Sequence, residues 1–322
     1  MSDRLLIVIP CLNEEEHLPG LLDQFVEENR DALIVVVDGG SSDASRLIIA
    51  EHSRTAANLI LLENPKRLQA AAVNLAVRRH GQGRDWLLRL DAHCSYPPEF
   101  ARKLIDAAKL RQATSVVVPM ITRGKRGFQI AAAAAQNSML GTGGAPHRHL
   151  GNGRYVDHGH HALMLLKDFQ AVGGYREDMF ANEDAELDLR LIQGGARIWL
   201  EPSQAIVYYP RRSPLSLWGQ YYNYGRGRFR TIRLHRIRPK LRQVAPVAAA
   251  MAAAVTVLSP VSWWFAAPAA VWFSLTLIAG VAVGIRAGGA PALLAGGAAM
   301  IMHLAWGAGF LVEAVRSPSD GL

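Results

Sequence analysis

The fold expected for this chain is decided by one stretch, Trp86-Leu87-Leu88-Arg89-Leu90-Asp91-Ala92-His93, in which an apolar run breaks off into an acid and a histidine. An apolar run of this length is typical of a buried strand. In open α/β sheets, ligands bind just outside the carboxyl ends of the strands. Asp91 and His93 can therefore face one cation or one phosphate-bearing ligand together. The plainer alternative is an aspartate that caps the next turn beside a surface histidine.

Strand-like and helix-like patterns alternate on both sides of this stretch. We expect strands over 5–10, 33–37, 59–62, 86–90 and 115–120, and helices over 14–29, 42–53, 69–79 and 98–109. Strands that alternate with helices of about 10–15 residues imply right-handed crossovers and a largely parallel sheet. After residue 120 the pattern is less regular, and further strands are expected near 155–158, 162–166 and 197–200. The prediction is an α/β domain with flanking helices.

The length of the chain and its cysteine content limit the class of protein that it can be. The chain has 322 residues, which suffices for one large domain or two smaller ones. Its two cysteines, Cys11 and Cys94, make no disulfide framework and suit a reducing compartment. The apolar run at 5–10 is too short for a signal peptide. We therefore expect the soluble part of the chain to lie in the cytoplasm.

The last part of the chain is apolar over a length that indicates membrane helices. Between residues 243 and 312 there is almost no charged side chain beyond Arg286. We expect about three spans near 244–262, 264–285 and 291–312, each close to the roughly 20 residues that a spanning helix needs. The alternative is a soluble helical domain rich in alanine and glycine, which the near-absence of charge disfavours.

A basic segment precedes these spans, and the net charge of +8 is concentrated in it. Its basic side chains are Arg226, Arg228, Arg230, Arg233, Arg236, Arg238, Lys240 and Arg242. By the positive-inside rule, the segment predicts that the soluble half of a multi-pass membrane protein lies in the cytoplasm. Anionic membrane lipids are the expected partner of this charge. Nucleic acid is the competing partner, but the position beside a membrane segment favours lipid, so no nucleic acid is expected.

Polar residues follow the first two expected strands. The first ends in Pro10-Cys11-Leu12-Asn13-Glu14, where proline blocks the strand and Asn13 and Glu14 face the crevice or cap the next helix. The second ends in Asp38-Gly39-Gly40-Ser41-Ser42-Asp43. A carboxylate beside flexible glycines suits a ribose or a base edge, because it accepts hydrogen bonds from hydroxyl and ring N–H groups. The alternative is a tight turn that Ser42 or Asp43 caps.

The third expected strand ends in Asn64-Pro65-Lys66-Arg67, whose cations suit either a pyrophosphate or a solvated turn. Glu14, Asp38, Arg67 and Asp91 thus stand at four strand ends. Together they predict a cleft for a nucleoside diphosphate and its metal. The chain has neither a Gly-x-Gly-x-x-Gly fingerprint nor a Walker lysine, so dinucleotide and P-loop chemistry are not supported.

At this point the chain resembles the inverting, membrane-associated glycosyltransferases of family 2, which have the GT-A nucleotide-diphospho-sugar transferase fold. The resemblance covers about residues 4–230. The matching motifs are Val8-Ile9-Pro10 with Asn13-Glu14-Glu15, Val37-Asp38-Gly39-Gly40-Ser41-Ser42-Asp43, Asp91-Ala92-His93 at the family's Asp-x-Asp metal motif, and Gly173-Gly174-Tyr175 followed by Asn182-Glu183-Asp184. Within the family, the chain is most similar to the ExoA-type glucosyltransferases of succinoglycan biosynthesis. The features behind that likeness are Asp91-Ala92-His93, Val156-Asp157-His158-Gly159-His160-His161 and Tyr221-Tyr222-Asn223-Tyr224-Gly225-Arg226-Gly227-Arg228.

The resemblance implies roles for individual residues. The nucleotide-sugar site would be formed by Pro10, Leu12, Glu14, Asp38, Arg67, Asp91, Ala92 and Arg226. Glu14 and Asp38 would hold the uracil and ribose, and Asp91 with His93 would hold a divalent metal, Mn²⁺ or Mg²⁺. Asp184 would be the general base that deprotonates an acceptor hydroxyl, and Glu183 would orient the acceptor. Direct displacement at the anomeric carbon would then invert its configuration.

The chain also departs from the family. His93 replaces a carboxylate, so the metal site loses a negative charge and gains a borderline nitrogen ligand, and Mn²⁺ should be tolerated at least as well as Mg²⁺. Many relatives have a histidine where this chain reads Val207-Tyr208-Tyr209-Pro210. The alternatives for the histidines at 158, 160 and 161 are to compensate for it or to serve in the core or acceptor loop. The Gln-x-x-Arg-Trp motif of processive synthases is missing, which favours addition of a single sugar.

The expected organisation follows from these features. Residues 1–212 would form the GT-A glycosyltransferase domain, 213–242 a basic amphipathic juxtamembrane segment, and 243–322 a transmembrane region with about three helices. The leading functional hypothesis is transfer of a sugar, glucose from UDP-glucose, onto a lipid-linked saccharide in exopolysaccharide biosynthesis. The alternatives are a polyprenyl-phosphate sugar synthase and a non-catalytic membrane protein that binds nucleotide sugars.

Overall fold

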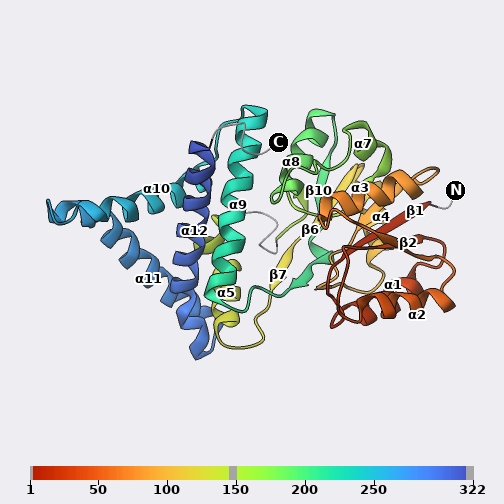
Figure 1. The fold of residues 1–322 in the computed structure, drawn as a ribbon, viewed down its shortest axis with the longest axis horizontal. Helices are drawn as coiled ribbons and strands as arrows, with labels where there is room; N and C mark the ends of the chain where they lie inside the picture. Colours follow the sequence, from red (N-terminus) through yellow and green to blue (C-terminus); the bar gives the residue numbers. More distant parts are fainter. Residues whose placement is uncertain (1–2, 145–150, 317–322) are drawn as a thin grey trace. The chain divides into compact units, whose positions relative to one another are not determined.

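A computed structural model describes residues 3–144 and 151–316 of the chain (Figure 1). The chain forms two compact units that are each discontinuous in sequence. The first comprises 1–120, 150–179 and 183–208, and the second comprises 121–149, 180–182 and 209–322. The division of the chain at residues 212 and 242 stays a prediction of the sequence.

The first unit is built on an eight-stranded sheet with the order β3-β2-β1-β4-β9-β6-β10-β8. The strands are β1 (Leu5–Cys11), β2 (Leu33–Asp38), β3 (Leu59–Glu63), β4 (Trp86–Arg89), β6 (Ser115–Val118), β8 (Arg154–Tyr155), β9 (His160–Leu165) and β10 (Ile198–Leu200). β3, β2, β1 and β4 run parallel, whereas β9 is antiparallel to both β4 and β6. The predicted α/β fold with a mainly parallel sheet is confirmed.

Both faces of this sheet are covered, which explains why its central strands read as nearly continuous apolar runs. In β1, Ile7 and Ile9 belong to one buried cluster, and Leu6 and Val8 belong to the other. This alternation follows from the period of two along a strand. The core therefore lies in two layers, one on each side of the sheet.

Helices supply the other half of each layer. α1 (Leu18–Glu28), α2 (Ser45–Thr55) and α4 (Phe100–Arg111) contribute to the first cluster, and α3 (Gln69–His80), α7 (Leu166–Ala171) and α8 (Glu183–Gln193) contribute to the second. The helix expected over 14–29 begins only at Leu18, because Pro19 occupies its first turn. α2 begins at Ser45 rather than at 42, where Asp43 accepts a hydrogen bond of 3.0 Å from the Ser45 amide.

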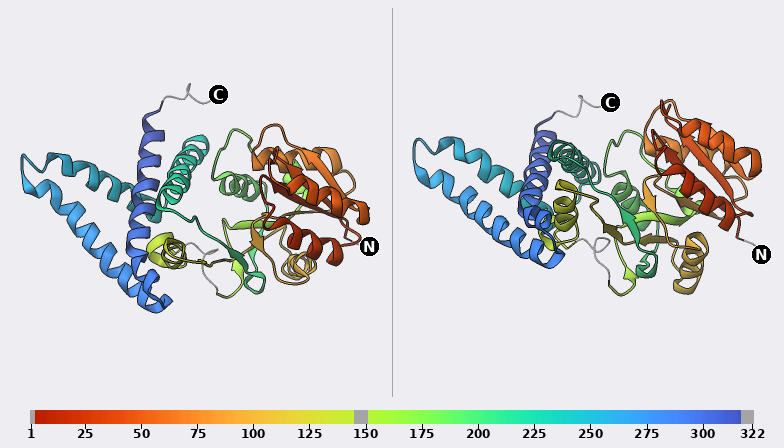
Figure 2. Two further views of the ribbon diagram at one scale, coloured as in Figure 1. Left: turned by 60° about the horizontal axis from the view of Figure 1, so that its bottom comes forward. Right: turned by 90° about the horizontal axis from the view of Figure 1, so that it is seen from below.

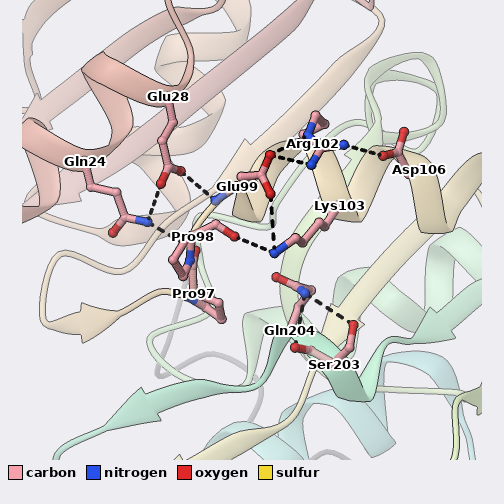
Figure 3. Close-up of polar contacts among 10 residues, drawn as sticks. All are labelled: Gln24, Glu28, Pro97, Pro98, Glu99, Arg102, Lys103, Asp106, Ser203 and Gln204. Carbon is pink, nitrogen blue, oxygen red and sulfur yellow. Dashed lines mark hydrogen bonds and ion pairs between the residues drawn. The ribbon is translucent and has the colours of Figure 1, made fainter.

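The segment that follows β4 is tied to α1 at the start of α4, as Figure 3 shows. Gln24 Nε2 donates to the carbonyl of Pro97 at 3.1 Å, and the Glu99 amide donates to Glu28 Oε2 at 3.1 Å. Nearer to β4, the short strands β5 (Cys94–Ser95) and β11 (Ile206–Tyr208) pair antiparallel. The backbone just beyond the carboxyl end of β4 is therefore held at two points.

The second unit is helical and its core is made largely of small residues. Its helices are α5 (Phe128–Gln136), α6 (Met139–Thr142), α9 (Pro214–His235), α10 (Leu241–Val255), α11 (Ala267–Ala287) and α12 (Ala295–Val315). Its buried cluster includes Ala131, Ala135, Ala298, Ala299 and Met302. Small side chains allow the helix backbones to approach closely, so much of the packing here is between main chains.

Three segments of this unit are long and apolar enough to cross a membrane: Leu241–Leu258, Trp263–Ala287 and Ala290–Val315. They coincide with the segments expected near 244–262, 264–285 and 291–312. The basic segment before them forms α9 up to His235, and Arg236 ends that helix with a φ of +52° in the left-handed region.

The contact between α9 and α12 depends on glycines, and it can be tested with a pair of substitutions on α12. A Cβ atom at Gly309 would lie 2.0 Å from the Tyr222 carbonyl oxygen, whereas one at Gly297 would meet nothing within 4 Å. Gly309→Ala is expected to lower the Tm of the detergent-solubilised protein. Gly297→Ala is the matched control and should keep or raise the Tm, because alanine favours helix by about 1 kcal/mol. Equal Tm values for the two variants would contradict the close contact.

Candidate active site

The carboxyl ends of β1, β2 and β4 lie at one edge of the sheet because the three strands are parallel neighbours. Two residues from different strand ends meet there. Nδ1 of His93 lies 3.1 Å from Oε1 of Glu14, and the Glu14 carboxylate also lies 3.7 Å from His17. Glu14 and His93, predicted separately as a nucleoside contact and a metal ligand, are therefore direct neighbours.

Asp38 is fully buried, and its carboxylate holds the turn that follows β2. It accepts hydrogen bonds of 3.1 Å from the amides of Gly40 and Ser41 and lies 3.5 Å from Arg46. Gly40 has a φ of +85°, a conformation that favours glycine. The carboxylate thus shapes the turn in this structure, and its contact with a nucleoside stays a prediction.

Two other predicted donor-site residues border the same turn. The guanidinium of Arg67 lies beside Gly40, where an added Cβ would be 3.2 Å from Arg67 Nη2. The exposed side chain of Leu12 lies beside Gly39, where an added Cβ would be 3.5 Å from Leu12 Cδ1. A cation and an apolar side chain therefore flank this glycine turn. Pro10 is partly buried in β1, and Ala92 is buried.

Arg89 joins Asp91, which is predicted for the donor side, to Asp184, which is predicted for the acceptor side. Its side chain is only 3 % exposed. Nη2 donates to Asp91 Oδ1 at 3.0 Å, and Nη1 donates to Asp184 Oδ1 and, at 3.1 Å, to the Tyr175 hydroxyl. Nε is buried and has no hydrogen-bond partner among the described residues, so the guanidinium keeps a donor that the protein does not use.

Neighbouring carboxylates keep the Arg89 guanidinium positively charged. Burial by itself would lower the pKa of the guanidinium, but the carboxylates of Asp184 and Asp91 outweigh burial and raise its pKa well above the ordinary value. A buried charge is tolerated only when it is paired and hydrogen-bonded, and this one is. Sequence analysis missed Arg89 because it was counted within an apolar run. The available signal was a charged residue in an otherwise apolar strand.

Asp91 is fixed in both side chain and backbone. Gln69 Nε2, at the first residue of α3, donates to Asp91 Oδ1 at 2.7 Å. The hydroxyl of Tyr96 accepts from the Asp91 amide at 2.6 Å and lies 3.1 Å from the Asp91 carbonyl oxygen. Neither Gln69 nor Tyr96 was among the predicted site residues. Together with Arg89 they orient the Asp91 carboxylate at the end of β4.

Glu183 and Asp184, at the start of α8, are adjacent acids in different surroundings. Asp184 Oδ1 accepts from the Tyr175 hydroxyl at 2.9 Å as well as from Arg89. Burial, followed by the charge of Asp184, raises the pKa of Glu183 to about 7. A carboxyl group with a pKa near neutral can exchange a proton at physiological pH. Glu183 therefore has this property, and it lies next to Asp184, whose role as a base stays a prediction.

A second carboxylate and histidine lie one helical turn further along α8. Asp188 is fully buried and lies 2.7 Å from His158 Nδ1, and its carboxylate accepts a hydrogen bond of 3.4 Å from the Gly159 amide. Because β9 runs antiparallel to β4, the residues just before β9 lie at the same sheet edge as the end of β4. His158 is therefore fixed at the edge that carries the site. The histidines at 160 and 161 have side chains outside the described part of the structure.

The residues predicted to bind metal offer a small donor set. Within 3–144 and 151–316, no group of three or more His, Cys, Asp or Glu side chains could hold a metal ion. One carboxylate and one imidazole, from Asp91 and His93, suit a borderline cation such as Mn²⁺. By donor type they fit a metal whose other ligands come from the diphosphate of a bound nucleotide and from water, and the binding of one ion by Asp91 and His93 together stays a prediction.

Arg226 belongs to the second unit. Its Nε donates to Glu313 Oε2 at 2.8 Å, and its guanidinium lies 4.4 Å from the ring centre of Phe180. Its contact with a donor nucleotide stays a prediction.

Because the pKa of Glu183 is raised, the free energy of unfolding is expected to fall as the pH rises. An unfolded glutamate ionises near pH 4.5 and Glu183 near pH 7, so ionisation destabilises the folded state increasingly as the pH rises between these values. Glu183→Gln should therefore raise Tm, relative to the parent, by more at about pH 8 than at about pH 5. Glu51→Gln, an exposed change on α2, is the control. A gain for Glu183→Gln that is equal at both pH values would contradict the burial of this carboxyl group.

Comparison with known proteins connects this geometry to a family. The family model described as "Glycosyl transferase family 2" matches residues 6–173. The chain is 45 % identical over 314 residues to the succinoglycan biosynthesis protein ExoA of Rhizobium meliloti (strain 1021), an alignment that covers 97 % of this chain and 95 % of that protein.

Solved structures share the fold. A mannosyltransferase from Pyrobaculum calidifontis, solved with GDP-Man and Mn²⁺, superposes with a TM-score of 0.60 at 18 % identity, over 98 % of this chain and 88 % of that chain. S. aureus TarS 1–349 in complex with UDP superposes with a TM-score of 0.51 at 14 % identity, over 99 % and 95 %. With the sheet order and the matched family model, these findings establish that the chain is a glycosyltransferase that belongs to glycosyl transferase family 2.

Proposed function

We propose that the protein transfers one sugar, glucose from UDP-glucose, onto a lipid-linked saccharide at the cytoplasmic face of a bacterial inner membrane, in exopolysaccharide biosynthesis. The relative that is 45 % identical over nearly the whole chain is named for succinoglycan biosynthesis, which supports the pathway class. The three long apolar helices support a membrane location. The observation that carries the proposal is Arg89, which joins the predicted donor group Asp91 to the predicted base Asp184.

On the donor side, we assign the diphosphate to Asp91 and His93 and the nucleoside to the β1 and β2 ends. A bound Mn²⁺ or Mg²⁺ would neutralise charge that develops on the departing diphosphate. Asp91 and His93 would hold the metal, and Arg67 beside the glycine turn would add a cation for the phosphates. Glu14 contacts His93 directly and therefore orients the imidazole as well as facing the nucleoside.

On the acceptor side, we assign Asp184 as the general base and Glu183 as the group that orients the acceptor. The acceptor O–H bond breaks and its proton passes to the Asp184 carboxylate. The acceptor oxygen forms a bond to the anomeric carbon while the bond from that carbon to the diphosphate oxygen breaks, and UDP leaves. Arg89 and Tyr175 hold Asp184 Oδ1, which fixes the carboxylate in one orientation during this step.

The assignment of Asp184 predicts a loss of transfer without a loss of donor binding. Asp184→Asn removes the proton acceptor and should lower the rate of UDP release in the presence of acceptor by at least about 10²-fold. The affinity for UDP, measured by calorimetry, should stay within a few-fold of the parent. Asp106→Asn, an exposed change on α4, is the control. Turnover of Asp184→Asn close to that of the parent would exclude Asp184 as the base.

The assignment of His93 predicts a change in metal preference. His93→Asp replaces the borderline nitrogen ligand by a hard oxygen and adds a negative charge, so it should shift activity from Mn²⁺ toward Mg²⁺. UDP release measured against the concentration of each ion gives the ratio of the two half-maximal concentrations. His52→Gln, on α2, is the control, and it should leave the ratio unchanged. An unchanged ratio in His93→Asp would argue against a metal at this residue.

One assay separates the proposal from its two alternatives. The purified protein is incubated with UDP-sugars, Mn²⁺ and a bacterial lipid extract, and UDP release is measured. Release that requires a lipid-linked saccharide supports the proposal. Release with bare polyprenyl phosphate supports a polyprenyl-phosphate sugar synthase, and no release with any donor supports a non-catalytic protein.

A further inference from the structure

Within the second unit, α12 runs alongside α9 in the same direction, as both Figure 1 and Figure 2 show. Gly309 packs on the backbone of Tyr222, and Gly225 packs on the backbone of Trp306. Further along both helices, Arg230 pairs with Glu313, and Arg233 Nη1 donates to the Arg316 carbonyl at 3.4 Å. Later residues of α9 thus meet later residues of α12, so the two helices are parallel neighbours. Their backbones are too close for α12 to slide past α9.

The end of α12 is also joined to α9 by charge. Arg226 Nε donates to Glu313 Oε2 at 2.8 Å, and Arg230 Nε donates to Glu313 Oε1 at 2.5 Å. Glu313 is only 2 % exposed. A buried carboxylate that lost these two partners would be strongly destabilised, so the contact is a fixed one. Glu313 and the basic end of α9 must therefore lie at the same depth in or beside a membrane.

This contact limits how often the intervening chain can cross a bilayer. α9 precedes the first apolar segment, and Glu313 lies near the end of the third. Three crossings would place Glu313 on the face opposite to Arg230, separated by a hydrocarbon core of about 30 Å. Only an even number of crossings between the two residues keeps their side chains in contact.

α10 and α11 leave α12 at different points and meet at their far ends (Figure 2). Gly307, in the second half of α12, packs on the Pro246 carbonyl of α10. Gly280 of α11 packs on Gly296, near the start of α12. The outer parts of α10 and α11 carry exposed apolar side chains, such as Met251 at 53 % and Val271 at 57 %, whereas nine of the 21 residues of α12 are buried.

We propose that α10 and α11 form a hairpin that crosses the membrane twice, and that α12 does not cross but lies along α9 at the face where the hairpin enters. The two segments of 18 and 25 residues lie within the range of about 17 to 25 residues that membrane-spanning helices have. Trp263 and Trp264, which stack at the hairpin tip, suit the far interface. The basic residues between 226 and 242 place the entry face in the cytoplasm.

The proposal is tested by the reactivity of single introduced cysteines in the full-length chain. Leu234→Cys lies on α9, Ser259→Cys at the hairpin tip, and Val315→Cys at the end of α12. The native Cys11 and Cys94 are buried, so the parent protein gives the background. Bacterial spheroplasts are treated with a membrane-impermeant maleimide before and after permeabilisation. Ser259→Cys is expected to react in intact spheroplasts, and the other two variants only after permeabilisation.

Two results would overturn the proposal. Reaction of Val315→Cys in intact spheroplasts, with Leu234→Cys protected, would establish an odd number of crossings. Protection of Ser259→Cys until permeabilisation would establish that the hairpin does not reach the far face. Val261→Cys repeats the test of the hairpin tip if Ser259→Cys does not accumulate. Green fluorescent protein joined after Leu322 reports by its fluorescence on which side of the membrane the C-terminus lies. None of these readouts depends on glycosyltransferase activity, so they are independent of the proposed function.

Discussion

The ion pair between the buried Arg89 and the partly buried Asp184 is the interaction on which the arrangement of the site depends. Arg89 stands on the central strand β4, so the sheet fixes its position, and the same guanidinium binds Asp91 two residues further on. Removing either carboxylate would leave a buried charge with fewer partners, which costs several kcal/mol. The proposed donor group Asp91 and the proposed base Asp184 are consequently parts of one charge network.

Sequence patterns sufficed to predict the mainly parallel sheet and its functional edge, because apolar runs that end in polar residues report directly on strand ends. They also singled out Glu14 and Asp91, and the family resemblance singled out Asp184; the roles of all three stay predictions. The sequence patterns did not predict Arg89 or Tyr175 as site residues, because the contacts that join Arg89 to Tyr175 and to Asp184 span 86 and 95 positions of the sequence. Nor did they predict that Asp38 holds its own turn, since a carboxylate beside glycines suits a turn and a ribose equally.

In the second unit, too, local sequence patterns did not predict contacts between residues far apart in the chain. Hydropathy located the three apolar segments, because length and absence of charge are local properties. It could not reveal that Glu313 pairs with Arg226 and Arg230, or that glycines bring α9 and α12 into backbone contact, since both depend on residues far apart in the chain. The basic residues predicted a lipid-facing segment, yet two of them neutralise a buried acid. Charge that sequence assigns to a partner can therefore be used within the fold.

The most direct test of the central claim is the transfer rate of Arg89→Lys, measured with UDP affinity and Tm. Lysine keeps the positive charge but cannot bridge two carboxylates with a planar fork. The account predicts a folded protein whose transfer falls by about 10²-fold, the effect expected when reacting groups are misplaced by about 1 Å. A folded Arg89→Lys variant that transfers sugar at the parent rate would contradict the claim that this guanidinium joins the two halves of the site.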